Sequence, residues 1–131
     1  MKKDKILNID IIAEIAKIGH TQYFVIADAG LPIPKGIKCI DIALVRGVPS
    51  FLQTLEAIND ELVIESYILA EEIKSANPVI SAKIEDLMSS KPKLYVPHSN
   101  FKELTKDSTV VIRTGETSSF ANIILIAGVN F

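Results

Sequence analysis

Two histidines and an aspartate stand at the predicted ends of strands, where side chains are free to do acid–base chemistry. His20 lies in the turn before a predicted strand at residues 23–27, and Asp28 directly follows that strand. His98 follows a second predicted strand, at residues 94–96. In α/β proteins, ligands bind at strand ends and on the loops next to them. Imidazole gives and takes a proton near neutral pH, so these residue types suit general acid–base catalysis.

Each of these polar residues also has a structural explanation. His20 is as consistent with capping the C-terminal end of the preceding predicted helix as it is with catalysis. Asp28 stands before Ala-Gly, which is typical of a turn aspartate that accepts hydrogen bonds from backbone amides. Asn122 can end a strand, and Arg113 and Glu116 can form an ion pair of little energetic value if exposed. Taken singly, none of them defines a site.

Several other chemistries lack a sequence pattern. No glycine-rich loop matches a phosphate-binding or dinucleotide-binding fingerprint, and no nucleophile elbow is present. The histidines, the cysteine and the aspartates show no recognised metal-ligand spacing. Cys39 lies inside a predicted buried strand, so we expect a packed core residue rather than a nucleophile.

The elements that position these residues follow from hydrophobic periodicity and from caps. A helical stripe begins near Asp10, taken as the N-cap, and stops at Gly19; Ser50 caps a later helix. Helices are predicted at residues 10–18, 51–59, 70–76, 78–87 and 101–106. Ser99 or Asn100 is expected to cap the last of them. Strands are predicted at residues 23–27, 39–44, 62–69, 94–96, 109–113 and 122–128. This alternation, with near-continuous apolar strands, predicts an α/β fold: a single three-layer domain over residues 1–131 with a mixed central β-sheet flanked by helices.

The composition limits location and partners. The 131 residues carry a net charge of −2, with no basic patch for nucleic acid. A single cysteine is consistent with a reducing compartment, and residues 1–7 lack the apolar core of a signal peptide. The longest apolar run, residues 123–129, is too short to span a bilayer, so we expect a cytoplasmic protein that does not contact membranes.

A hydrophobic fraction of 48% is high for a chain of this size, and it predicts self-association. Topology points the same way. A helix-to-strand turn and a strand-to-helix loop normally lie on opposite edges of one sheet. Within one subunit His20 therefore need not lie near His98, and a shared site would need a second subunit.

The motifs together resemble those of the ribose pyranase and fucose mutarotase family. Their residues match the ribose enzymes more closely than the fucose enzymes. The Asp-Ala-Gly-Leu-Pro-Ile-Pro string after an upstream Gly-His-Thr is specific, and the similarity extends over essentially the whole chain. The matching segments are residues 7–8, 19–21, 28–34, 47–51, 70–74, 111–116, 121–125 and 127–129, before a terminal Phe131.

The resemblance implies interconversion of the β-pyranose and β-furanose forms of D-ribose without metal or cofactor. It also implies a homo-oligomer, a ring-based decamer, with sites between subunits. His20 occupies the position of the family's proton donor. The implied sugar-binding positions are Asp28, His98, Lys102, Phe120, Ala121 and Asn122.

One departure from the family pattern falls in the predicted site. Ser119-Phe120 stands where the ribose enzymes carry Pro-Tyr, so a ring is kept and a hydroxyl is lost. Three alternatives stay open: a non-catalytic monosaccharide-binding module, a mutarotase for another sugar such as L-fucose, and a phosphocarrier with His20 as phosphoacceptor.

Overall fold

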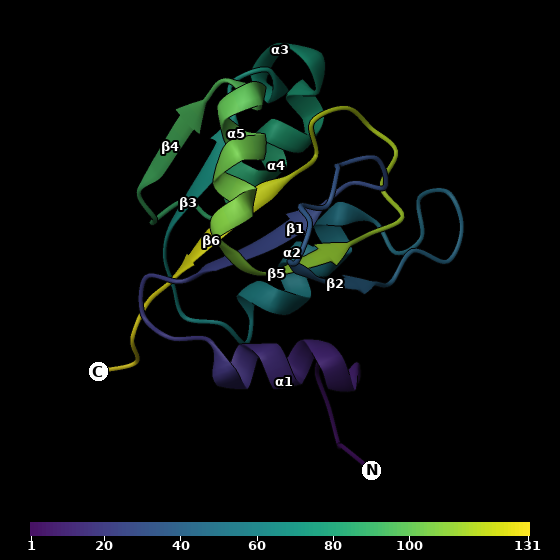
Figure 1. Cartoon of the computed structure of the whole chain (residues 1–131), viewed down its shortest axis with the longest axis vertical. Helices are drawn as coiled ribbons and strands as arrows, with labels where there is room; N and C mark the ends of the chain where they lie inside the picture. Colours follow the sequence, from purple (N-terminus) through teal and green to yellow (C-terminus); the bar gives the residue numbers. More distant parts are fainter.

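The computed structural model describes residues 1–131, and it has a six-stranded sheet with helices on both faces (Figure 1). The strands are β1 (Tyr23–Ala27), β2 (Lys38–Asp41), β3 (Ile64–Ala70), β4 (Lys93–Val96), β5 (Ser108–Arg113) and β6 (Ile123–Ala127). The helices are α1 (Ile9–Lys17), α2 (Phe51–Asn59), α3 (Ile73–Ala76), α4 (Pro78–Leu87) and α5 (His98–Leu104), followed by the short 3₁₀ helix η1 (Thr105–Asp107). The strand order is β2-β5-β1-β6-β3-β4.

The sheet is mixed, as predicted, because one strand runs against the others. β1 pairs in parallel with β5, which pairs in parallel with β2, and β3 pairs in parallel with β4. β6 lies between β1 and β3 and is antiparallel to both. The start of β6 therefore lies at the same sheet edge as the carboxyl ends of β1 and β4.

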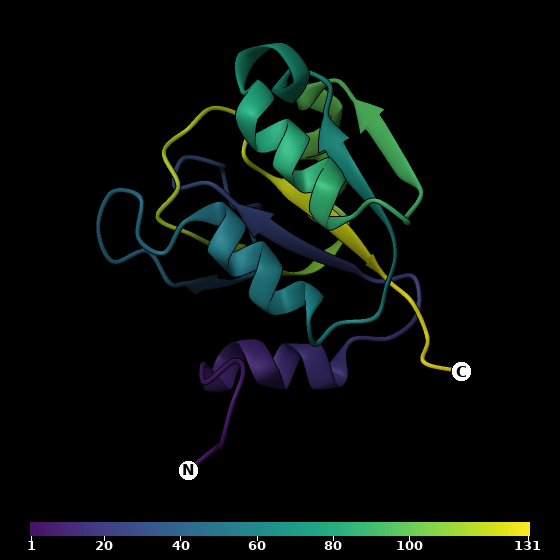
Figure 2. The same cartoon turned by 180° about the vertical axis from the view of Figure 1, so that it is seen from behind.

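Helices cover the sheet on both faces. Because both faces are buried, the strands are apolar along nearly their whole length. Alternate residues of β1 point to opposite faces. Phe24 and Ile26 join a large cluster with α1, α2 and α4, whereas Val25 and Ala27 join a smaller cluster with Phe101 of α5. Figure 2 shows α2 and α4 on the face of the sheet opposite to α5. The predicted three-layer α/β arrangement is confirmed.

The helix caps differ from the predictions at two places. The N-cap of α1 is Asn8, whose Oδ1 accepts a hydrogen bond from the N–H of Ile11 at 3.0 Å, whereas Asp10 lies in the first turn. Helix α5 begins at His98 and not near residue 101, and neither Ser99 nor Asn100 caps it. The predicted Ser50 cap of α2 is confirmed, as a full capping box with Gln53.

Strand β2 is shorter than predicted, and Cys39 is exposed rather than packed in the core. β2 is an edge strand, with only Ile40 directed into the core. Beyond Asp41 the chain turns back on itself, because the N–H of Leu44 donates to the carbonyl of Val48 at 2.9 Å. The apolar run at residues 39–44 thus belongs partly to a loop. No helix of the chain is long and apolar enough to cross a membrane.

Candidate active site

A cavity of about 290 Å³ lies at the carboxyl edge of the sheet. The loop after β1, the start of α5 and the loop before β6 form its walls. The lining residues are Asp28, Gly30, Leu31, Pro32, His98, Ser119 and Phe120. The antiparallel direction of β6 brings the last two of these to the same edge as Asp28 and His98. Three of the predicted sugar-binding residues, Asp28, His98 and Phe120, therefore meet in one cavity.

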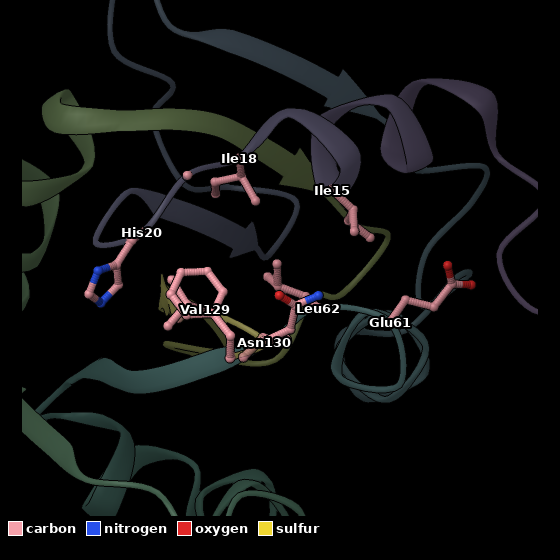
Figure 3. A pocket seen from close by; sticks show the side chains of 11 residues that line it. Ile15, Ile18, His20, Glu61, Leu62, Val129 and Asn130 are labelled. Atoms are coloured by element: carbon pink, nitrogen blue, oxygen red, sulfur yellow. The ribbon is translucent and has the colours of Figure 1, made fainter.

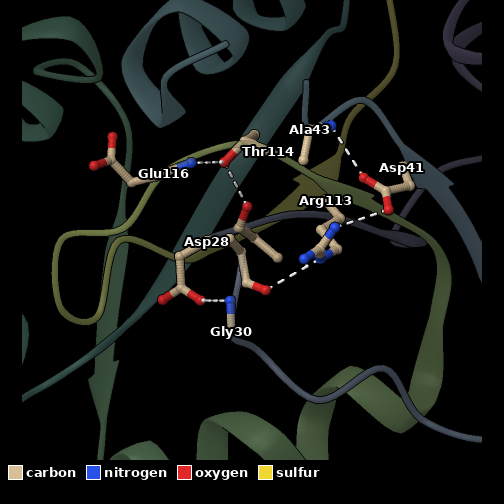
Figure 4. Close-up of polar contacts among 9 residues, drawn as sticks. Asp28, Gly30, Asp41, Ala43, Arg113, Thr114 and Glu116 are labelled. Atoms are coloured by element: carbon tan, nitrogen blue, oxygen red, sulfur yellow. Dashed lines mark hydrogen bonds and ion pairs between the residues drawn. The ribbon is translucent and has the colours of Figure 1, made fainter. Parts of the chain in front are cut away.

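Asp28 is held by a reciprocal pair of hydrogen bonds with Asn122. The N–H of Asp28 donates to Oδ1 of Asn122 at 2.7 Å, and Nδ2 of Asn122 donates to Oδ2 of Asp28 at 2.8 Å. The N–H of Gly30 donates to Oδ1 of Asp28 at 2.9 Å (Figure 4). Asn122 is fully buried, and its amide is engaged with Asp28. Asn122 thus orients a carboxylate that retains free lone pairs toward the cavity.

His98 presents a polar atom that has no protein partner. Its ring packs against Phe101 at 6.2 Å between centroids, nearly parallel, and meets Phe120 edge-on at 5.0 Å. Nδ1 of His98 is buried and makes no hydrogen bond. A buried polar atom left without a partner costs about 1–3 kcal/mol. His98 lines the cavity, and Nδ1 would gain a partner only if ligand binding exposed it.

The loop that carries Phe120 is fixed at its β5 end. Thr114 donates from Oγ1 to the carbonyl of Ala27 at 2.7 Å, and Arg113 donates from Nε to the carbonyl of Ala29 at 3.1 Å. Arg113 also pairs with Asp41 at 2.8 Å, so it forms no ion pair with Glu116 (Figure 4). Phe120 has a φ of 57°, a left-handed conformation that is strained for a residue other than glycine.

His20 lies at the opposite edge of the sheet. Nε2 of its half-exposed ring lies 3.1 Å from Oε2 of Glu65, the second residue of β3. The carboxylate of Glu65, and not the end of helix α1, is thus the partner of this imidazole. A second cavity, of about 360 Å³, borders His20 and is otherwise lined largely by apolar residues. Figure 3 shows the ring of His20 at one end of this cavity, directed away from Ile15 and Glu61.

The turn that carries His20 is tightly constrained. The N–H of Gln22 donates to the carbonyl of Gly19 at 3.2 Å, and its side-chain Oε1 accepts from the N–H of Gly19 at 2.7 Å. Thr21 has a φ of 68° and donates its N–H to the carbonyl of Ala127 at 2.8 Å. Strain of this kind in a β-branched residue persists only where the surroundings fix the backbone, and it is concentrated at functional sites.

The remaining predicted residues occupy supporting positions. Ala121 is fully buried, and Lys102 is exposed on α5, one turn after His98; neither residue lines the cavity. No three His, Cys, Asp or Glu side chains converge so as to hold a metal ion. Sequence reasoning missed Glu65, Glu72 and Asn77, whose contacts join segments far apart in the chain. It considered Glu116 only as a partner of Arg113, whereas Glu116 binds Phe51 and Ser118.

The chain belongs to the RbsD / FucU transport protein family, whose model matches residues 1–130. Among curated relatives, the D-ribose pyranase of Geobacillus thermodenitrificans is 52% identical over 131 residues, covering 100% of this chain and 99% of the relative. The D-ribose pyranase of Laribacter hongkongensis is 48% identical, covering 100% of both chains.

Solved structures agree with this assignment. Bacillus subtilis RbsD complexed with D-ribose superposes with a TM-score of 0.97 at 46% identity, covering 100% of both chains. The fucose mutarotase of Streptococcus pneumoniae, in complex with L-fucose, is more distant, with a TM-score of 0.80 at 25% identity and 95% of each chain covered.

Proposed function

We propose that this chain is an isomerase that interconverts the β-pyranose and β-furanose forms of D-ribose. The observation that carries the proposal is the full-length similarity to D-ribose pyranases, 52% identical in one case, joined to a ribose complex of the same fold. The cavity at the carboxyl edge suits a monosaccharide. It combines an oriented carboxylate, an imidazole and an aromatic ring.

The chemistry needs only proton transfer. The two ring forms differ in which hydroxyl group closes on C1, so interconversion requires loss of the proton of the anomeric hydroxyl and protonation of the ring oxygen. Bond rotation and reclosure by the 4-hydroxyl follow. The open intermediate is a neutral aldehyde, which calls for no electron sink, so the proposal includes no metal or cofactor. General acid–base catalysis of this kind contributes roughly 10²–10⁴-fold.

The family resemblance and the positions of the side chains support the following roles. His20 donates a proton to the ring oxygen on opening and takes a proton from the 4-hydroxyl on reclosure, while Glu65 holds Nε2 and leaves Nδ1 for proton exchange. The anomeric oxygen loses its proton on opening and regains one on reclosure. Asp28 and His98 bind sugar hydroxyls, and Phe120 packs on the apolar face of the sugar. Asn122 and Ala121 form the floor behind them. Lys102 reaches the sugar from α5 when the site is complete.

One sugar bound at the carboxyl edge is out of reach of His20 of the same chain, which lies at the opposite edge. We therefore propose that a second copy supplies His20, in a homo-oligomer built as a ring-based decamer. Apolar side chains on several surfaces support such contacts: Leu44 is 77% exposed, Ile9 83% and Leu94 55%. We also propose that the chain forms one domain and works in the cytoplasm, where imported ribose would be its substrate.

The test is magnetisation-transfer NMR of D-ribose with and without the protein. We expect the wild-type protein to accelerate exchange between the ring forms and His20→Ala to reduce that acceleration at least about 100-fold. Lys106→Ala, an exposed change on η1, is the control. Ring exchange by His20→Ala as fast as by the wild type would refute the role of His20.

The same experiment, run on D-ribose and on L-fucose, separates two of the alternatives. A non-catalytic binding module would bind ribose without accelerating ring exchange. A mutarotase for another sugar would act on L-fucose in preference to D-ribose. Because the fucose enzyme is the more distant structural relative, we expect D-ribose to be the better substrate.

A further inference from the structure

The connection between β3 and α4, residues 71–77, touches both walls of the cavity without lining it. On the first wall, both carboxylate oxygens of Glu72 accept the N–H of His98, at 2.9 and 3.1 Å. The N–H of Glu71 donates to the carbonyl of Val96 at 2.7 Å. Glu72 thereby fixes the backbone from which the His98 ring enters the cavity.

Asn77, at the other end of this connection, holds the second wall. Its Nδ2 donates to Oγ of Ser118 and to the carbonyl of Ser119, each at 2.9 Å. Asn77 is 8% exposed and occupies the N-cap position of α4, yet its side chain makes no capping hydrogen bond. The side-chain amide of Asn77 therefore makes its hydrogen bonds to the loop that carries Phe120 and not to the N-terminus of α4.

The loop is tied in turn to α2. Oγ of Ser118 donates to Oε2 of Glu116 at 2.9 Å, and Oε1 of Glu116 accepts the N–H of Phe51 at 3.2 Å. Hydrogen bonds thus run from Asn77 through Ser118 and Glu116 to the start of α2. The loop is clamped just before Phe120, the residue whose backbone is strained.

We propose that Glu72 and Asn77 are positioning residues that set the spacing between the His98 and Phe120 walls, and thereby the affinity of the cavity for its sugar. Two ordinary hydrogen bonds from Asn77 are comparable in strength to the strain of one left-handed residue such as Phe120. Without them the loop relaxes, and the edge-on contact between Phe120 and His98 is lost. The identity of the sugar rests on the proposed function; the clamp on the loop does not.

The experiment tests two variants, each with its own control. Asn77→Asp is compared with the control Asn59→Ala, and Glu72→Ala is compared with the control Glu71→Ala. Asn77→Asp keeps the side-chain volume but loses the Nδ2 donor, and Asn59, the last residue of α2, makes no side-chain hydrogen bond to the loop. Glu71 neighbours Glu72 but pairs with Lys74 on the surface. We expect Asn77→Asp and Glu72→Ala each to raise the KM for D-ribose roughly tenfold, with kcat changed less than about threefold, and both controls to match the wild type.

Hydrogen–deuterium exchange gives a readout that does not depend on activity. The N–H of Asn122 donates to the carbonyl of Phe120, and we expect its exchange to accelerate in Asn77→Asp but not in Asn59→Ala. Should Asn77→Asp fold poorly, Ser118→Ala breaks the same clamp more mildly, with a smaller rise in KM.

An unchanged KM together with unchanged exchange at Asn122 would overturn the proposal. So would a loss of kcat and melting temperature at constant KM, which indicates a purely structural role. A wild-type protein that fails to accelerate ring exchange would refute the proposed function, whereas the exchange measurement would still decide whether Asn77 clamps the loop.

Discussion

The amide of Asn122 makes its hydrogen bonds to Asp28, a residue 94 positions earlier in the chain. The sequence places both residues near strand ends, and that much is predictable from local pattern. Their pairing is not, because it depends on the antiparallel strand β6 lying beside β1. In this structure the amide of Asn122 orients a carboxylate. The contact between Glu65 and His20 cannot be predicted from local pattern either, because it joins residues 45 positions apart.

The Asp28–Asn122 pair predicts a loss of stability when the amide is removed. Asn122→Ala leaves the part-buried N–H of Asp28 without its acceptor and Oδ2 of Asp28 without its donor, while Oδ1 keeps the N–H of Gly30. We expect the free energy of unfolding to fall by about 1–3 kcal/mol in urea titrations, and the affinity for D-ribose to fall with it. The same change at the exposed Asn100 is the control. Equal stability and affinity in both variants would show that the pair does not orient Asp28.

At the scale of elements, the sequence predicts most boundaries where the signal is local. Strand β1 and helix α4 match their predicted bounds, because a β-branched run and a proline in the first turn are read directly from neighbouring residues. Helix α5 begins earlier than predicted because its first N–H is satisfied by Glu72, a residue on another connection. A capping partner so far along the chain cannot be recognised from the residues next to the helix.

The loop before β6 and the start of α2 share one carboxylate, Glu116, and this predicts a pH dependence. Partial burial alone would raise the pKa of Glu116, but hydrogen bonds from the hydroxyl and N–H of Ser118 and from the N–H groups of Phe51 and Thr117 outweigh it and lower the pKa below its ordinary 4.5. A carboxyl group with a lowered pKa in the folded state stabilises the protein above its unfolded-state pKa. That contribution is lost as the pH falls through the lowered value.

We therefore expect the stability advantage of the wild type over Glu116→Gln to be constant near neutral pH and to shrink as the pH falls below about 4.5. Urea unfolding of both proteins between neutral and acidic pH measures this difference. Glu56→Gln, an exposed change on α2, corrects for the general effect of removing a charge. A difference that does not vary with pH would show that Glu116 is not held ionised by the loop.

At the scale of the whole molecule, the sheet separates the two histidines. The sequence predicts this separation, because His20 lies in a helix-to-strand turn and His98 in a strand-to-helix loop. Strand order and the direction of β6 are properties of the assembled sheet, so the meeting of Asp28, His98 and Phe120 in one cavity could not be derived from local pattern. If His20 acts on a sugar in that cavity, the acting histidine belongs to another copy.

Complementation between two inactive variants tests this account most directly. His20→Ala and Asp28→Ala should each fail to accelerate ring exchange of D-ribose in magnetisation-transfer NMR. When the two are unfolded together and reassembled in equal amounts, random mixing pairs an intact His20 with an intact Asp28 in roughly a quarter of the sites. We predict recovery of about a quarter of the wild-type rate. A co-assembled mixture that stays as inactive as its components, beside a fully active wild type treated in the same way, would contradict a site shared between copies.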